Sequence, residues 1–149
     1  MTGPKFLNKV IFSGGIDWNE LFTADVDLSS YQYYFVQPAS TAGKVMLATG
    51  ASNPTPLGVL QNTPTQGKLA QVKLAGLTKL YIKTPSGCGL AYGRFITASD
   101  TGQGAPQATE TGTPIAGRWL DVSVAAASSS TGLALIFSPG MGGCAVSAC

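Results

Sequence analysis

The chain has 149 residues, which is the size of one domain and is long enough to bury a core of its own. Charged residues make up only 11% of it, and the nine basic and seven acidic side chains are scattered, giving a net charge of +2. These figures argue against a disordered tail and against the dense cationic surface of a nucleic-acid-binding protein, and the absence of histidine removes the commonest general base and the commonest zinc ligand.

No apolar run approaches the roughly eighteen residues that cross a bilayer. The apolar run Val10–Phe12 near the N-terminus is far shorter than a signal-peptide core. We therefore expect a soluble protein that has no membrane partner and carries no export signal.

The three cysteines are Cys88, Cys144 and Cys149. Their spacing does not match a zinc knuckle, so we expect no metal site and no cofactor. The odd number favours three reduced thiols in a protein made in a cytosol. The alternative is a Cys144–Cys149 bridge, or a bridge between chains, that forms after cell lysis.

The predicted elements begin after an extended arm, residues 1–20, in which Gly and Pro recur without a period. A short helix near Trp18–Phe22 is the one plausible helix of the chain. The segment Ser30–Gln37 is rich in aromatic and β-branched residues and predicts a strand. Two shorter strands follow at Lys44–Ala48 and Leu57–Leu60, separated by a turn-rich segment.

The segments Lys68–Leu74 and Thr78–Lys83 alternate cleanly, with Leu80 and Ile82 facing inward. A three-residue turn centred on Gly76 would make them a hairpin and set Lys73 opposite Lys79. Opposed like charges favour a carboxylate-bearing partner for this face, to which Tyr81 and Lys83 also belong. The alternative is a solvated face whose lysines splay apart.

The remaining pattern predicts a strand at Arg94–Ala98, a polar surface loop over Ser99–Thr113 and a long strand within Pro114–Ala127. A turn over Ser128–Gly132, a last strand at Leu133–Phe137 and a Gly-rich tail, residues 138–149, complete the chain. Some eight short strands and no internal repeat favour an all-β fold, a compact antiparallel β-barrel or β-sandwich spanning residues 21–137.

Trp119 is a candidate interface anchor. If Leu120, Val122 and Val124 face the core, the pleat of the strand turns Trp119 outward onto a polar face. The alternative is that a loop or the arm of the same chain covers the indole ring.

The carboxylates offer little catalytic chemistry. Asp25 and Asp27 precede a strand, where side-chain hydrogen bonds to the backbone of a turn explain them better than an acid–base pair or a calcium site. A β-rich enzyme would have to use these two with Asp100, Glu110 or Asp121, and it would lack histidine and any acidic cluster. We therefore expect a protein that is not an enzyme.

Several segments in a fixed order carry a family resemblance. They are Thr23–Val36, Pro56–Pro64 (PLGVLQNTP), Gly67–Tyr81 with its central Ala75-Gly76, Gly93–Thr97 (GRFIT), Pro114–Val124 and Gly132–Phe137. Together they resemble the small β-rich decoration, or cement, proteins on the outside of tailed-bacteriophage capsids, over roughly residues 21–137.

The resemblance implies a structural virion protein, made in the host cytoplasm, that binds the outer surface of the expanded capsid. It implies a homotrimer that bridges subunits of the major capsid protein and stabilises the head against internal pressure. The rival reading is a glycan-binding virion module, a fibre or lectin-like domain that stacks sugars on Trp119 and tyrosine rings.

Overall fold

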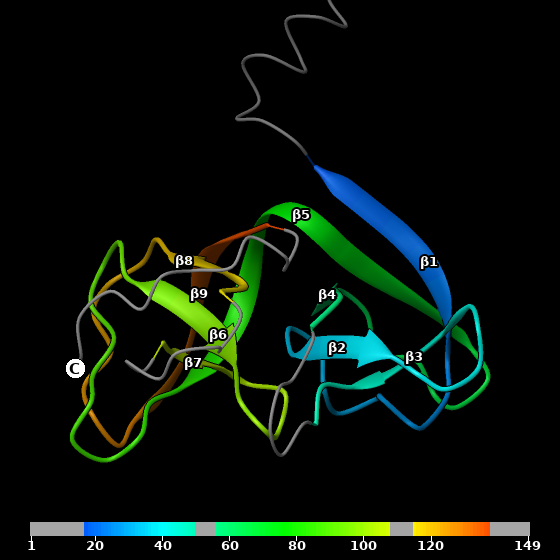
Figure 1. The fold of residues 1–149 in the computed structure, drawn as a ribbon, viewed down its shortest axis with the longest axis horizontal. Helices are drawn as coiled ribbons and strands as arrows, with labels where there is room; N and C mark the ends of the chain where they lie inside the picture. Colours follow the sequence, from blue (N-terminus) through cyan, green and yellow to red (C-terminus); the bar gives the residue numbers. More distant parts are fainter. Residues whose placement is uncertain (1–16, 50–55, 108–114, 138–149) are drawn as a thin grey trace, which may run out of the picture.

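The computed structural model describes residues 17–49, 56–107 and 115–137, and within these ranges every regular element is a β-strand (Figure 1). The all-β class predicted from the sequence is confirmed. The strands are β1 (Trp18–Ala24), β2 (Phe35–Pro38), β3 (Lys44–Leu47), β4 (Gly58–Leu60), β5 (Leu69–Lys83), β6 (Phe95–Ala98), β7 (Gly104–Pro106), β8 (Gly117–Trp119) and β9 (Ser129–Ile136).

One long strand, β5, belongs to two closed rings of strands. The first barrel is the ring β1-β3-β2-β4-β5, which closes through the β1–β5 pairing. The second barrel is the ring β5-β7-β6-β8-β9, which closes through β5–β9. In Figure 1, β5 arches between them, with β1 to β4 on one side and β6 to β9 on the other. The fold is therefore a barrel rather than a sandwich.

The predicted hairpin at Gly76 is wrong, because β5 runs through that residue without reversing. Residues before Gly76 pair with β1 and β4, and residues after it pair with β9 and β7. Gly76 has a φ of 117°, which a glycine adopts without strain. Even-numbered residues from Ala70 to Ile82 point inward in both barrels, so the alternation alone fits a hairpin and a continuous strand equally well.

The two barrels repeat the same topology. Each has one parallel pair, β1–β3 or β5–β7, and four antiparallel pairs in the same cyclic order. The register repeats as well. The equivalent cross-strand pairs are Phe35↔Val59 and Phe95↔Arg118, Leu60↔Val72 and Trp119↔Ala134, and Asn19↔Lys73 and Leu77↔Leu135.

The turns repeat too. The N–H of Tyr33 donates to Leu60 O at 2.8 Å, and the N–H of Gly93 donates to Trp119 O at 2.7 Å, with both donor residues at positive φ. The prediction of no internal repeat is thus wrong for the fold. The equivalent residues are mostly different, which is why the sequence does not show the repeat.

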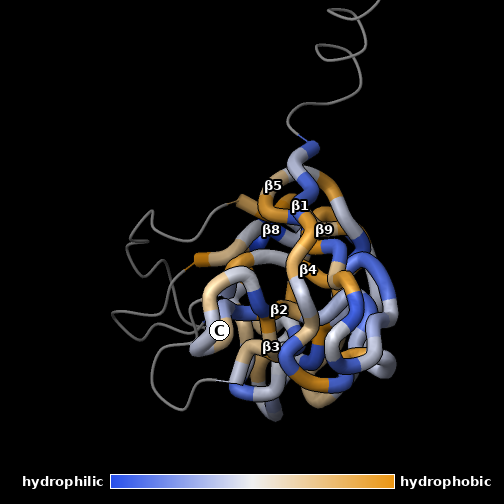
Figure 2. Tube along the Cα trace, turned by 90° about the vertical axis from the view of Figure 1, so that its right-hand side faces the viewer, coloured by the Kyte–Doolittle hydropathy of each residue, from blue (hydrophilic) through white to orange (hydrophobic). Residues whose placement is uncertain are grey.

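Two hydrophobic clusters fill the molecule. One lies in the first barrel and includes Val36, Leu60 and Val72. The other fills the second barrel around Trp119 and also takes in Phe35, Ala48 and Val59 from the first. Figure 2 shows hydrophobic segments gathered near β1, β5 and β9. Because the first barrel contributes side chains to the core of the second, the two barrels pack as one unit.

Backbone hydrogen bonds reinforce this junction. The N–H of Phe35 donates to Gly102 O at 2.7 Å, and the N–H of Tyr81 donates to Tyr33 O at 2.9 Å. The chain from Tyr33 to Phe35 is therefore held between β5 and the β6–β7 turn of the second barrel.

Several predicted boundaries need correction near the N-terminal side. Trp18–Phe22 is strand rather than helix, because β5 supplies its backbone partners. The predicted arm therefore ends before residue 18, while residues 1–16 lie outside the described part. The predicted strand Ser30–Gln37 begins only at Phe35, because a turn with Tyr33 at φ 68° precedes it.

Later boundaries also differ. The loop predicted at Ser99–Thr113 contains β7, and β9 begins at Ser129, inside the predicted turn Ser128–Gly132. The long strand predicted within Pro114–Ala127 shortens to β8, because the chain turns at Asp121. The first two differences come from pairing with distant strands, which local patterns do not encode.

Cys88 is disulfide-bonded, which corrects the expectation of three reduced thiols. Its partner lies outside the described residues, as do Cys144 and Cys149. The described residues contain no helix able to span a bilayer.

The glycines at equivalent positions of β4 and β8 generate a stability prediction. A Cβ on Gly58 would lie against Lys73 O, and a Cβ on Gly117 would lie against Leu135 O. We expect Gly58→Ala and Gly117→Ala each to lower the free energy of unfolding by about 1–3 kcal/mol, measured by urea denaturation. Gly67→Asn is the matched control, because its turn has open space and asparagine tolerates positive φ. Equal effects at all three glycines would contradict the argument.

Candidate interaction surfaces

Four of the five predicted interface residues lie on β5, at Lys73, Lys79, Tyr81 and Lys83. All four occupy odd positions, whose side chains point away from the barrel interiors. The prediction placed them on one face of a two-stranded hairpin, whereas the structure places them on a single continuous strand. Lys73 pairs with Asn19 and Val59, whereas Lys79 pairs with Leu133, so the two lysines are not opposed.

Lys73 is buried, with 9% of its surface exposed. Its Nζ lies 2.5 Å from Asp17 Oδ1 and donates to Leu77 O at 3.1 Å. The hydrogen bond from Lys73 holds the pKa of Asp17 below its usual value. Lys73 therefore anchors the start of β1 and is not a free surface cation.

Tyr81 and Lys79 contact a tyrosine cluster in the turn before β2. The Tyr81 ring stacks on Tyr34 with centroids 5.0 Å apart, and Tyr34 meets Tyr31 edge to face at 5.3 Å. Lys79 Nζ lies 6.0 Å from the Tyr33 ring. These half-buried rings cover the junction between the barrels, and the stacked faces of Tyr34 and Tyr81 are occupied by each other.

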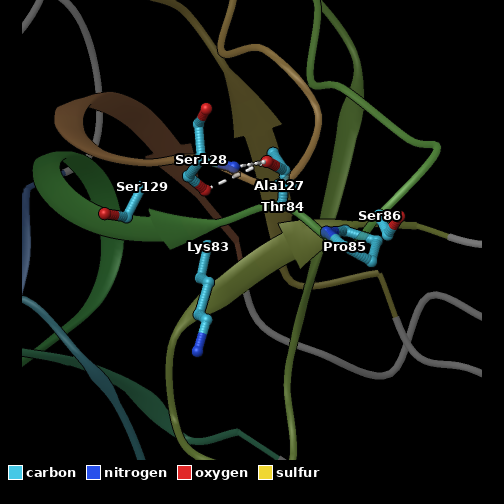
Figure 3. Close-up of a pocket in the computed structure, with 7 residues that line it drawn as sticks. All are labelled: Lys83, Thr84, Pro85, Ser86, Ala127, Ser128 and Ser129. Atoms are coloured by element: carbon cyan, nitrogen blue, oxygen red, sulfur yellow. Dashed lines mark hydrogen bonds between the residues drawn. The ribbon is translucent and has the colours of Figure 1, made fainter.

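Lys83 is exposed at the end of β5, between two shallow hollows. One, of about 350 Å³, is lined by Thr84, Ser86 and the segment 127–129, and the other, of about 330 Å³, by Ser99–Thr101 and Gln103. Figure 3 shows Lys83 pointing away from the hydroxyl groups of the first hollow. Thr84 Oγ1 accepts from Ser128 N at 3.0 Å and donates to Ala125 O at 2.6 Å, so this hydroxyl serves the loop.

The expected outward position of Trp119 is wrong. The indole ring is fully buried, and its Nε1 donates to Val122 O at 2.9 Å. The alternation expected over Leu120, Val122 and Val124 does not occur, because β8 ends at Trp119. Val122 belongs to the following turn, where it is 76% exposed. Trp119 instead points into the second barrel and belongs to its core cluster, so a loop over an outward ring does not describe it either, and it offers no stacking platform to a sugar.

The candidate carboxylates serve local structure. Asp27 Oδ1 accepts from Ser29 N at 3.0 Å, as the turn interpretation predicts, and Asp25 pairs with Lys44 at 3.2 Å. Asp121 accepts from the N–H groups of Val122 at 2.8 Å and Leu133 at 2.9 Å. These backbone donors lower the pKa of Asp27 and Asp121. Asp100 borders the second hollow, and Glu110 lies outside the described residues.

Within the described ranges, no three His, Cys, Asp or Glu side chains come together as a metal site. Asp25, Asp27 and Asp121 each bond to a nearby backbone or lysine group.

An exposed apolar patch on the β5–β9 ladder was not predicted from the sequence. Leu77 pairs with Leu135, and Leu133 pairs with Lys79, so their side chains share the outer face. Their exposed fractions are 42% for Leu77, 39% for Leu133 and 36% for Leu135. The sequence Leu133–Ile136 (LALI) does indicate this patch, because residues on both faces of the strand are apolar. A strand with one solvated face would have polar residues on that face.

No protein-family model and no curated protein matches this chain. Among solved structures, it is similar to the N base of the head fibre gp8.5 of bacteriophage phi29. The TM-score is 0.51 at 14% identity, over 85% of this chain and 98% of that one. At this identity the likeness shows a shared fold.

The burial of Trp119 gives a stability prediction. Trp119→Ala should lower the free energy of unfolding by about 3–5 kcal/mol, because it empties the centre of the second core. Tyr92→Ala, at a side chain 70% exposed, is the control and should change it little. Chemical denaturation measures both, and a small loss for Trp119→Ala would contradict the packing described.

The Asp17–Lys73 pair gives a prediction about pH. Since the pKa of Asp17 is lowered in the folded state, its contribution is present above the unfolded pKa and is lost as pH falls through the folded one. Asp17→Asn should therefore lower the thermal transition at pH 7, and the difference should shrink towards pH 2. Asp100→Asn, which removes an exposed charge, is the control. A difference that persists undiminished in acid would contradict the role of the carboxylate charge.

Proposed function

We propose that this chain is a structural protein of a phage virion that binds the outer surface of the expanded capsid. It bridges neighbouring subunits of the major capsid protein, acts as a homotrimer, and stabilises the shell. The observation that carries the proposal is the likeness in fold to the N base of a phage head fibre. The sequence segments that resemble cement proteins, in the same order along the chain, support it.

The architecture suits a mechanical role. Both rings of strands are closed, so the described strands would contact a shell through barrel faces rather than by pairing along open strand edges. A rigid pair of barrels that touches several subunits adds buried area, which must be exposed again before those subunits separate. Binding only the expanded lattice follows if the subunits reach the right spacing only there.

The proposed role is not catalytic. Of the candidate carboxylates, Asp25, Asp27 and Asp121 are bonded to nearby backbone or lysine groups, and Thr84 beside the first hollow is engaged by its own loop. These observations support contact rather than chemistry as the work of the chain.

The test is to mix the purified protein with undecorated expanded capsids and with unexpanded procapsids. We expect co-sedimentation with expanded shells only, and a higher temperature of thermal disruption for the shells that carry the protein. Binding to neither particle would overturn the proposal. Binding without any rise in disruption temperature would leave a virion protein that does not stabilise the head.

A further inference from the structure

The repeated topology allows the same surface to be compared in the two barrels. In the first barrel, the outward row Asn19, Lys73, Val59 and Phe35 follows the register from β1 to β2. In the second barrel, the equivalent outward row is Leu77, Leu135, Arg118 and Phe95, from β5 to β6. We call this second set the outer row.

The first-barrel row is a packing surface. Phe35 and Val59 are fully buried in the cluster that fills the second barrel, and Lys73 is buried beside them. The outer row has no such cover within the described part of the chain, since Leu77, Leu135 and Arg118 are exposed. This face of the barrel can therefore bury against protein, and in the second barrel the described residues leave it uncovered.

The apolar character of this surface is not required by the fold. At the positions equivalent to Leu77 and Leu133, the first barrel has Asn19 and Gln71, and the ring closes there in the same register. The two leucines thus expose apolar area at sites where the architecture accepts polar side chains. Such area on a surface marks a contact with another molecule.

The charges around the leucines indicate the chemistry of that molecule. Lys79 lies opposite Leu133, and the Arg118 guanidinium lies 4.6 Å from the centroid of the Phe95 ring. Neither cation pairs with a carboxylate of the described ranges. Asp17 and Asp121 are already engaged, since Asp17 binds Lys73 and Asp121 accepts two backbone N–H groups.

We propose that the outer row, with Leu133 and Lys79, is the surface that meets the capsid shell. Its partner is a protein surface with an apolar centre bordered by carboxylates. This inference rests on the proposed function and names the contact that the function uses. The leucines place it on a protein rather than on the phosphates of a nucleic acid, and Lys79 and Arg118 select acidic neighbours.

Other occupants fit less well. A second copy that met this face with its own would oppose like charges. A second copy that met this face with its first barrel could not repeat the packing between the barrels of one chain. That packing uses the hydrogen bond from Tyr81 N–H to Tyr33 O, whereas the equivalent donor in the first barrel, Thr23 N–H, already donates to Gly43 O at 2.9 Å. Residues 1–16 of the same chain carry Lys5 and Lys9 and no carboxylate.

The decisive variant is Leu77→Asn with Leu133→Gln, which copies the first barrel at the equivalent positions. We expect its affinity for expanded capsids to fall at least about tenfold, with the circular dichroism and thermal transition unchanged. Leu21→Lys is the matched control, because it removes a leucine that is 61% exposed and copies Lys79 at its equivalent in the first barrel. This control should bind as the unmodified chain does.

A second variant, Lys79→Gln with Arg118→Gln, tests the charges and still decides the question if the first does not fold. It should bind more weakly at low salt and show a flatter dependence of affinity on salt concentration. The charge variant, the leucine double variant and the Leu21→Lys control are all measured by co-sedimentation over a range of protein concentrations.

The outcomes separate the two proposals. If the unmodified chain binds no capsid, the proposed function fails. If it binds and the leucine and charge variants bind equally well, only the present inference fails. A leucine variant that lowers the mass of the free protein in light scattering would assign the face to a second copy. Tighter capsid binding after deletion of residues 1–15 would assign it to the chain's own N-terminal segment.

Discussion

The structure depends on one constraint, which is that β5 must satisfy its backbone hydrogen bonds in two closed rings at once. Its first half pairs with β1 and β4, and its second half pairs with β9 and β7. Closing a ring removes open edges, which are liable to pair with other chains. Sharing a strand also ties the barrels together through covalent backbone, so neither can rotate freely about a linker.

The shared strand explains why the barrels pack as one unit. Because β5 belongs to both barrels, the outward row of the first barrel lies against the second barrel, and Phe35 and Val59 join the core of the second. The backbone from Tyr33 to Phe35 then bonds to β5 on one side and to the β6–β7 turn on the other, and Tyr34 stacks on Tyr81 beside it. Packing, hydrogen bonding and ring contacts thus depend on the same placement.

The repeat also separates what the fold requires from what it does not. Glycine recurs at Gly58 and Gly117 because the neighbouring carbonyl oxygen leaves no room for a Cβ. Phenylalanine recurs at Phe35 and Phe95, although only Phe35 is fully buried. By contrast, the outward positions of the β1–β5 and β5–β9 ladders hold unrelated side chains, such as Asn19 and Leu77. Comparison of equivalent positions therefore identifies surface residues that the barrel itself does not need.

The sequence by itself determined the all-β class, the inward phase of β5 and the turn at Asp27, because alternation and side-chain hydrogen bonding act over a few residues. It also placed Lys79, Tyr81 and Lys83 on one strand face. Only the tertiary structure decided that β5 continues through Gly76, that Trp119 is buried, that Lys73 binds Asp17, and that three leucines form an exposed patch. Each of these depends on a strand or loop that is distant in the sequence, and a pattern that repeats every two residues does not specify which distant strand supplies the partner.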